Sequence, residues 1–175
     1  MQVIDILTPV RVAVSGASSG QATGQSPGEP AKSVRNKKDA IRCLAELLCA
    51  RMANEDAGDS LTPDDVETLL AQREEQQSTG VGGGVAIPHA FGDLTQIRGA
   101  VLLCPNAVGF DAIDGLPVKI FFAVIGPRRE VGAHLKTLAR VSRLLRDEAF
   151  RQRLVEAKDG RAAFELIVRE ESRPQ

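Results

Sequence analysis

One stretch of the sequence, TGVGGGVAIPHA at residues 79–90, combines four glycines with a proline directly before His89, one of the two histidines of the chain. Glycines allow successive backbone N–H groups to point into one hollow, which binds anions. Pro88 fixes its own φ and so restricts where the following imidazole points. A neutral imidazole keeps one unprotonated nitrogen that can attack phosphorus. The stretch therefore indicates a histidine that carries a phosphoryl group.

Other sites built on glycines or histidines do not fit this spacing. A nucleotide-binding P-loop ends in Gly-Lys-Ser/Thr, whereas Gly84 is followed by Val85. The dinucleotide-binding fingerprint requires a small residue where Val85 stands. A zinc site needs three or four ligands, and two distant histidines with scattered cysteines do not supply them. A serine-type triad lacks its nucleophile-elbow motif. We expect neither a metal ion nor an organic cofactor.

Further residues could complete a phosphoryl site. A dianionic phosphoryl group needs positive charge, and Arg73 falls seven residues after Val66, on the inward face of an expected helix. His134 begins a later helix, where the helix dipole favours anions, and its ring could donate a hydrogen bond to the phosphoryl oxygens. Amide and hydroxyl donors for the same group are expected from the loop residues Ser78, Thr79, Gly80 and Gly82.

Each of these signals also has a structural interpretation. An arginine in the last turn of a helix complements the helix dipole and extends its charge to solvent. His134 lies on an apolar stripe, as a core histidine would. The glycines fit a flexible turn, and Asp111 and Asp114 fit residues that stabilise a turn. The phosphoryl interpretation depends on the convergence of all of them.

The composition narrows the function classes. A length of 175 residues suits one domain with its own core. The formal net charge of −1 argues against a nucleic-acid partner. No apolar run approaches the ~20 residues that span a bilayer, and no secretory leader opens the chain. An odd set of three cysteines without a CxxC motif suits reduced thiols, so we expect a cytoplasmic protein.

The hydrophobic pattern predicts a single α/β domain, with a central mixed β-sheet flanked by helices on both faces. Residues 1–14 predict a short helix or turn and then a strand, and residues 15–33 a mobile loop. Residues 97–104 and 118–126 predict strands, the second buried on both faces, with an Asp114-Gly115 turn between them.

Three helices carry clear signals. An apolar stripe predicts the first, at Ile41, Leu44, Ala45, Leu48 and Met52. Thr62 as N-cap and Pro63 at the first helical position predict the start of the second, with a stripe at Val66, Leu69 and Leu70. A third stripe comprises His134, Leu138, Val141 and Leu145. Asp147 and Asp159 are expected to cap two more helices.

The stretch around His89 resembles the enzyme IIA domain of the phosphoenolpyruvate-dependent phosphotransferase system, in its fructose/mannitol and nitrogen-regulatory class. Every place of that family's signature is filled, by Glu74, Val81, Gly82, Val85, Ala86, Ile87, Pro88, His89 and Ala90. The segments DILTP, FDAIDGLPVKIFFAVIGP and HLKTLARVSRLLRDEAFRQRL are also similar to the family, so the resemblance spans nearly the whole chain. The loop departs from the nitrogen-type pattern, because Gly83 stands where an asparagine is common.

The resemblance implies roles for three residues. His89 matches the histidine that accepts a phosphoryl group from the phosphocarrier HPr or its nitrogen-branch counterpart. Arg73 matches the family's active-site arginine, and His134 its second, non-phosphorylated histidine. Phe91 is expected at an exposed apolar rim that a partner contacts.

Three roles remain open for such a domain. No IIB, IIC or HPr module is attached to this chain, so we expect a nitrogen-regulatory IIA with regulatory target proteins. The alternatives are a sugar-uptake component that passes the group to a IIB domain, and a module that binds partners without chemistry.

Overall fold

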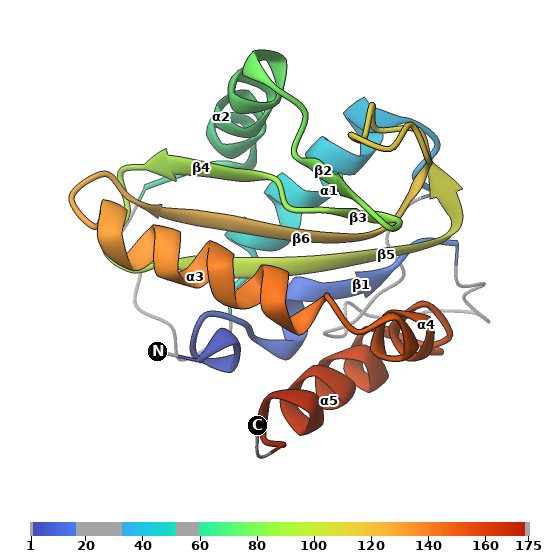
Figure 1. The fold of residues 1–175 in the computed structure, drawn as a ribbon. Helices are drawn as coiled ribbons and strands as arrows, with labels where there is room; N and C mark the ends of the chain where they lie inside the picture. The colour runs from blue at the N-terminus through green and yellow to red at the C-terminus, as the bar shows by residue number, and fades with distance from the viewer. Residues whose placement is uncertain (1, 17–32, 52–59, 174–175) are drawn as a thin grey trace, which may run out of the picture.

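The apolar run at residues 118–127 forms β6 (Val118–Pro127), the strand at the centre of a six-stranded mixed sheet (Figure 1). The computed structural model describes residues 2–16, 33–51 and 60–173. Every residue of β6 except Lys119 is buried. This pattern confirms the prediction of a strand covered on both faces.

The sheet has the strand order β1-β5-β6-β3-β2, and β4 also pairs with β6. The other strands are β1 (Val12–Val14), β2 (Gly80–Gly82), β3 (Val85–Ala86), β4 (His89–Gly92) and β5 (Arg98–Val108). The β5–β6 and β2–β3 pairs are antiparallel, whereas β1 is parallel to β5 and both β3 and β4 are parallel to β6.

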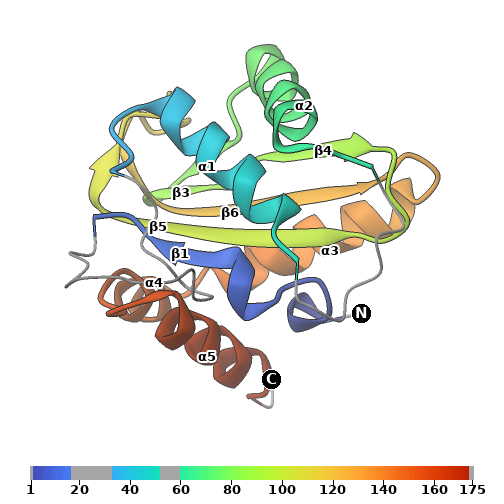
Figure 2. The ribbon, with the colours of Figure 1, turned by 180° about the vertical axis from the view of Figure 1, so that it is seen from behind.

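Helices cover both faces of the sheet, which confirms the predicted three-layer fold. Figures 1 and 2 show α1 (Lys37–Cys49) and α2 (Pro63–Gln76) on one face. The opposite face carries α3 (Val131–Leu144), α4 (Glu148–Val155) and α5 (Gly160–Glu171), with the short helices η1 (Val3–Asp5) and η2 (Pro9–Arg11). One apolar core lies on each face of the sheet. No helix in the described residues is long and apolar enough to cross a membrane.

The predicted helix starts are confirmed. Thr62 and Asp65 form a reciprocal capping box at the start of α2, and Pro63 is its first residue. The carboxylates of Asp147 and Asp159 accept the amides of Phe150 and Ala162, and thereby cap α4 and α5.

The apolar stripes are confirmed in most positions. The described stripe residues of α1 are all buried, and Met52 lies outside the described residues. In α3, Leu138 is half-buried and the other members of its stripe are buried. Most of the loop predicted at 15–33 also lies outside the described residues, but Ser15 is paired at the end of β1 through the carbonyl of Leu103.

The inward face of α2 differs from the prediction. The buried residues are Val66, Leu70 and Glu74, and Arg73 is half-buried. With 100° per residue, Arg73 lies about 60° from Leu70 and Glu74 only about 40°. The face is centred on Leu70, so Glu74 points inward and Arg73 lies at the edge.

Candidate functional site

His89 is the first residue of β4 and follows directly after a short break that separates β3 from β4. Both strands lie beside β6. β3 pairs with β6 at Val85↔Ile120, and β4 pairs in the same register at His89↔Val124. Pro88 lies in the break and has no N–H to donate, while its carbonyl accepts the amide of Val124 at 2.9 Å. The half-buried imidazole is therefore fixed by the central strand of the sheet.

The same break determines which nitrogen of the neutral His89 ring carries the proton. Nδ1 lies 2.8 Å from the carbonyl oxygen of Ile87. A carbonyl oxygen only accepts hydrogen bonds, so Nδ1 carries the proton and donates it. The neutral ring then keeps its lone pair on Nε2, so that nitrogen is the one that could act as a nucleophile.

The second histidine lies directly behind the first. His134 is in the first turns of α3 with 1% of its surface exposed. Its ring centroid is 6.0 Å from that of His89, at an interplanar angle of 52°. Phe91 packs on His134 with centroids 4.4 Å apart. A Cβ on Gly126 would lie only 2.6 Å from Nδ1 of His134, so the ring needs a glycine on β6.

Neither nitrogen of the His134 ring has a hydrogen-bond partner among the described residues. A buried imidazole without partners costs roughly 1–3 kcal/mol, and such a group in a native structure calls for an explanation. The ring always has at least one N–H, so it can donate to a group carried by His89. This arrangement brings the two predicted histidines into one site.

The electrostatics keep both rings neutral near pH 7. Burial, and to a smaller extent the neighbouring His89, lower the pKa of His134 to about 4. Burial also lowers the pKa of His89, and the positive charge of Arg73 acts in the same direction. The hydrogen bond to Ile87 and the charge of Glu74 oppose this decrease. A neutral His89 is the form that can attack phosphorus.

The contacts and charge of Arg73 agree in part with a helix-end arginine and in part with an arginine that acts on His89. Its Nη1 donates to the carbonyl of Gln77 at 3.0 Å, at the C-terminal end of α2, as a helix-end arginine would. Its positive charge also lowers the pKa of His89.

The glycine loop does not surround His89, contrary to the prediction. Gly82, Gly83 and Gly84 have φ of +93°, +64° and +75° and form the tip of the β2–β3 hairpin. Val85, opposite Gly82, pairs four residues before His89 along β6, a separation of about 13 Å. In Figure 1 the hairpin tip and β4 lie at opposite ends of the segment that β3 and β4 form along β6. Gly82 therefore does not lie beside His89, and its predicted role in binding the phosphoryl group stays a prediction.

Asp114 explains the conformation of the hairpin tip. Its Oδ2 accepts the amide of Gly83 at 2.9 Å, and its Oδ1 accepts the amide of Leu116. These two bonds hold the pKa of Asp114 below its usual value. The predicted turn is confirmed at Gly115, whose amide donates to Ala112 and whose φ is +69°.

The remaining loop residues lie nearer to His89, but their donors are engaged. The carbonyl of Thr79 accepts the amide of Ile87 at 2.9 Å, which places this segment beside the break. The amide and hydroxyl of Thr79 both donate to Glu74, and the hydroxyl of Ser78 donates to Phe110. The amide of Gly80 donates to the oxygen of Ser78. These bonds hold the backbone and engage the donors of Thr79 and Gly80 within the protein. The predicted role of these residues in binding the phosphoryl group stays a prediction.

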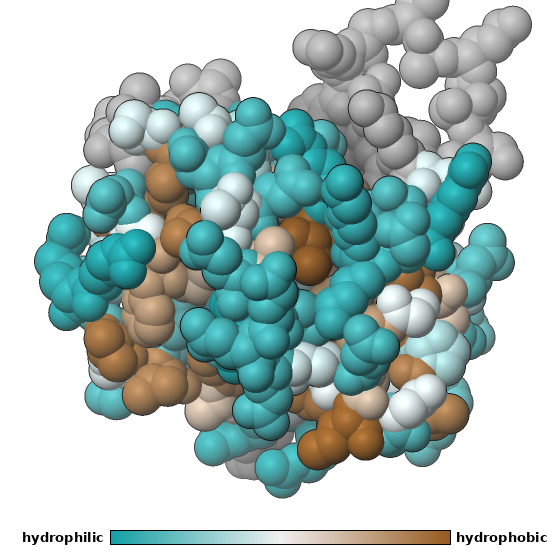
Figure 3. Space-filling model, turned by 90° about the horizontal axis from the view of Figure 1, so that it is seen from above, coloured by the Kyte–Doolittle hydropathy of each residue, from teal (hydrophilic) through white to brown (hydrophobic). Residues whose placement is uncertain are grey.

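Exposed apolar residues gather in two places. Val131 and Leu135 lie at the start of α3, next to His134, and the other group is Val81, Ile113 and Leu116 near β2. The face in Figure 3 is mostly hydrophilic, with separate hydrophobic areas. Phe91, predicted at an exposed rim, is half-buried against His134 instead.

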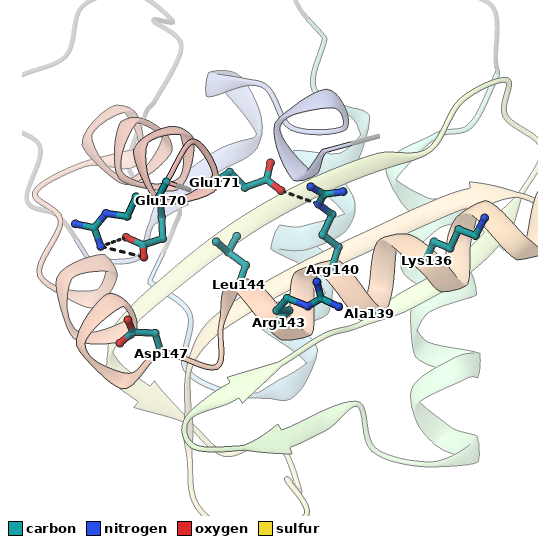
Figure 4. Close-up of a pocket in the computed structure, with 9 residues that line it drawn as sticks. Lys136, Ala139, Arg140, Arg143, Leu144, Asp147, Glu170 and Glu171 are labelled. Carbon is teal, nitrogen blue, oxygen red and sulfur yellow. Dashed lines mark hydrogen bonds and ion pairs between the residues drawn. The ribbon is translucent and has the colours of Figure 1, made fainter. Parts of the chain in front are cut away.

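A cavity of about 620 Å³ lies away from the histidines, between α3 and α5 (Figure 4). Arg140 extends across it to Glu171, with Nε 3.1 Å from Oε1. Arg143 lines the same cavity on the outer surface of α3, whereas His134 is on its inner surface. The described residues contain no cluster of three or more His, Cys, Asp or Glu side chains that could hold a metal ion.

The comparison with known families decides where the chain belongs. The model of the family "Phosphoenolpyruvate-dependent sugar phosphotransferase system, EIIA 2" matches residues 29–170. The chain belongs to this family. The signature residues around His89 are thus those of an EIIA 2 domain.

Individual relatives agree with the family. A nitrogen regulatory protein of Bradyrhizobium diazoefficiens is 33% identical over 139 residues, which cover 79% of this chain and 86% of that protein. A fructose-specific EIIA component of Haloferax volcanii is also 33% identical, over 75% of this chain and 82% of its own. The crystal structure of the nitrogen regulatory protein IIA-Ntr from Neisseria meningitidis superposes with a TM-score of 0.73, at 27% identity, and covers 93% of this chain and 97% of its own.

Two features of the EIIA 2 site were not found from the sequence. Glu74 is a signature residue, but its burial depends on the rotation of α2, which the apolar pattern did not fix. Gly126 gave no signal, because an isolated glycine at the end of an apolar strand does not reveal which side chain approaches it.

Proposed function

We propose that this EIIA 2 domain is a phosphohistidine carrier in which Nε2 of His89 accepts a phosphoryl group from phosphorylated HPr or its nitrogen-branch counterpart. The observation that carries the proposal is the pair of rings. The ring of His89 is neutral, half-buried and has its lone pair on Nε2. The ring of His134 is buried with its centroid 6.0 Å away, and it has no hydrogen-bond partner among the residues that the structure describes.

The transfer needs no additional reactant. The lone pair of Nε2 forms the new N–P bond while the N–P bond to the donor's histidine breaks, and that histidine regains its lone pair. Positive charge develops on the His89 ring during the attack. The carbonyl of Ile87 stabilises this charge through the Nδ1 proton. In such a transfer the protein contributes mainly position and electrostatics.

The neighbouring residues have separate roles in this proposal. His134 donates a ring N–H to a phosphoryl oxygen and so obtains the partner that it lacks among the described residues. Arg73 offsets part of the negative charge of the phosphoryl group. Partners would contact the half-exposed edge of His89, close to the exposed side chains of Val131 and Leu135.

Within the family we favour the nitrogen-regulatory branch, in which the phosphorylation state changes which target proteins are bound. The support is the similarity to nitrogen regulatory proteins over more than three quarters of this chain. The fructose-specific relative supports a second candidate, transfer from His89 to a IIB domain in sugar uptake.

One labelling experiment tests the carrier function. The protein is incubated with enzyme I, HPr and ³²P-labelled phosphoenolpyruvate. We expect a labelled protein whose label is released in acid and is stable in base, as for a phosphohistidine. The His89→Ala variant should remain folded and unlabelled. Labelling of that variant would assign the site to another residue, and no labelling of the unmodified protein would leave only a partner-binding role.

The same labelled protein separates the two branches. Loss of the label to an added fructose-type IIB domain would favour sugar uptake. Retention of the label, together with binding partners that differ between the labelled and unlabelled forms, would favour regulation.

A further inference from the structure

Glu74 is a buried acidic residue that has no direct role in the proposed phosphoryl transfer. Only 5% of its surface is exposed. Its Oε2 accepts both the amide of Thr79, at 2.9 Å, and the hydroxyl of Thr79, at 2.5 Å. Burial of a carboxylate is costly unless the group is paired and hydrogen-bonded. The site therefore contains a charge that the fold retains at some expense.

The second oxygen of Glu74 contacts a cation. Nζ of Lys37, at the start of α1, lies 3.0 Å from Oε1, in an ion pair that is not aligned as a hydrogen bond. The same ammonium lies 3.1 Å from Asp111 and 4.9 Å from the centre of the Phe110 ring. The carboxylate thus connects α1 and α2 to the segment that leads into β2.

Thr79 connects the carboxylate to the reactive histidine. Its carbonyl accepts the amide of Ile87 at 2.9 Å, and the carbonyl of Ile87 accepts the Nδ1 proton of His89 at 2.8 Å. Ile87 lies in the break between β3 and β4, where pairing with β6 is interrupted. Its peptide groups consequently depend on Thr79 for support on that side.

We propose that Glu74 is a positioning residue for His89: by holding Thr79 it fixes the backbone of Ile87, whose carbonyl keeps the proton on Nδ1 and leaves Nε2 unprotonated. The consequence for transfer rests on the proposed carrier function. The effect on the ring itself does not.

The charge of Glu74 adds a second effect. It raises the pKa of His89, against the larger lowering by burial and the opposing charge of Arg73. Among the described residues, the charges that act on the pKa of His89 are those of Arg73 and Glu74 from α2, and the ring of His134 from α3 lies with its centroid 6.0 Å away. Glu74 favours the positive charge that develops on the ring when Nε2 attacks phosphorus.

A matched pair of variants tests the proposal. Glu74→Gln removes the buried charge and keeps one oxygen that can accept from Thr79. Glu75→Gln makes the same chemical change one residue further along α2, where the side chain is exposed. Because the chain has two histidines, ¹⁵N NMR of the imidazoles reports the tautomer and the pKa of His89 with little overlap.

We expect three changes in Glu74→Gln and none in Glu75→Gln. The Nε2-protonated tautomer of His89 becomes detectable, the pKa of His89 decreases, and phosphoryl transfer slows roughly fivefold, the factor for the loss of one ordinary hydrogen bond. If Glu74→Gln does not fold, Thr79→Val serves instead, because it removes one of the two bonds to Glu74 and keeps the size of the side chain. It should produce the tautomer change and slower transfer.

An unchanged tautomer, pKa and transfer rate would overturn the proposal, even if the variant unfolds more easily, because Glu74 would then support the fold alone. A failure of the carrier function is recognised separately. In that case the unmodified protein takes no label, while the NMR comparison still shows whether Glu74 controls the His89 ring.

Discussion

The rings of His89 and His134 lie with their centroids 6.0 Å apart and their planes tilted by 52°, and the buried ring of the pair has no hydrogen-bond partner in the described structure. His134 therefore costs stability in the resting protein, and under the proposed function it recovers this cost when His89 carries a phosphoryl group. A residue with these properties should show opposite effects on stability and on activity.

The variant His134→Phe tests this opposition. A phenyl ring fills similar space and has no polar atoms, so the free energy of unfolding should stay the same or rise by about 1 kcal/mol. Phosphoryl transfer should slow by on the order of 100-fold, as when one donor to a developing charge is removed. Chemical denaturation and rapid-quench labelling measure the two quantities. Lower stability together with an unchanged rate would assign His134 to the core alone.

Stability should fall in acid because of the same histidine. The pKa of His134 is about 4 in the folded protein, whereas a histidine in the unfolded chain has a pKa of 6.5. Between these two pH values the unfolded chain therefore binds more protons than the folded protein. The free energy of unfolding should therefore decrease as the pH falls from about 6.5 to about 4, by roughly 3 kcal/mol for a shift of this size. His89 contributes in the same direction, since its pKa is also lowered. Denaturation across this pH range should show a smaller decrease for His134→Phe, and an identical decrease would contradict the assignment.

Arg73→Ala should slow transfer by on the order of tenfold, or about 1.4 kcal/mol in the barrier, because the phosphoryl group loses a positive charge. The pKa of His89 should rise in this variant, since the charge of Arg73 lowers it. Arg143→Ala is the matched control, as it removes an arginine from the outer surface of α3. Equal rates for the two variants and the unmodified protein would restrict Arg73 to its bond with Gln77 at the end of α2.

Gly126→Ala should displace the His134 ring. The added methyl group would lie 2.6 Å from Nδ1, and such overpacking costs typically about 1–3 kcal/mol. Gly132→Ala is the control, because nothing lies within 4 Å of its added methyl group. In a His134→Ala background most of the cost of Gly126→Ala should disappear, as a double-mutant cycle of unfolding free energies would show. Full additivity would mean that the methyl group strains β6 itself.

The layers of the fold were predictable from local chemistry. Helix caps such as Thr62 act within one turn, and the run at 118–126 is apolar enough to require cover on both faces. The signature around His89 was equally accessible, because it is a continuous piece of sequence.

The surroundings of His89 were less predictable, because they depend on register and rotation. The glycines precede His89 closely in the sequence, but the strand between them is extended and carries them about 13 Å apart. Arg73 and Glu74 are adjacent, and only the packing of α2 on the sheet decides which of them is buried. For the first reason the glycines do not lie beside His89 as expected, and for the second reason the burial of Glu74 was not predicted.

The position of the proton on the His89 ring is determined by the interruption in strand pairing between β3 and β4. Between β3 and β4, Pro88 has no N–H to donate, and the carbonyl of the neighbouring Ile87 accepts a hydrogen bond from the imidazole of His89. The proposed nucleophile is consequently held by its pairing with the central strand β6, and it does not have to be ordered when a partner arrives. A design that copies this chemistry into another scaffold should reproduce the interrupted strand beside a buried central strand, and it does not need the adjacent hairpin.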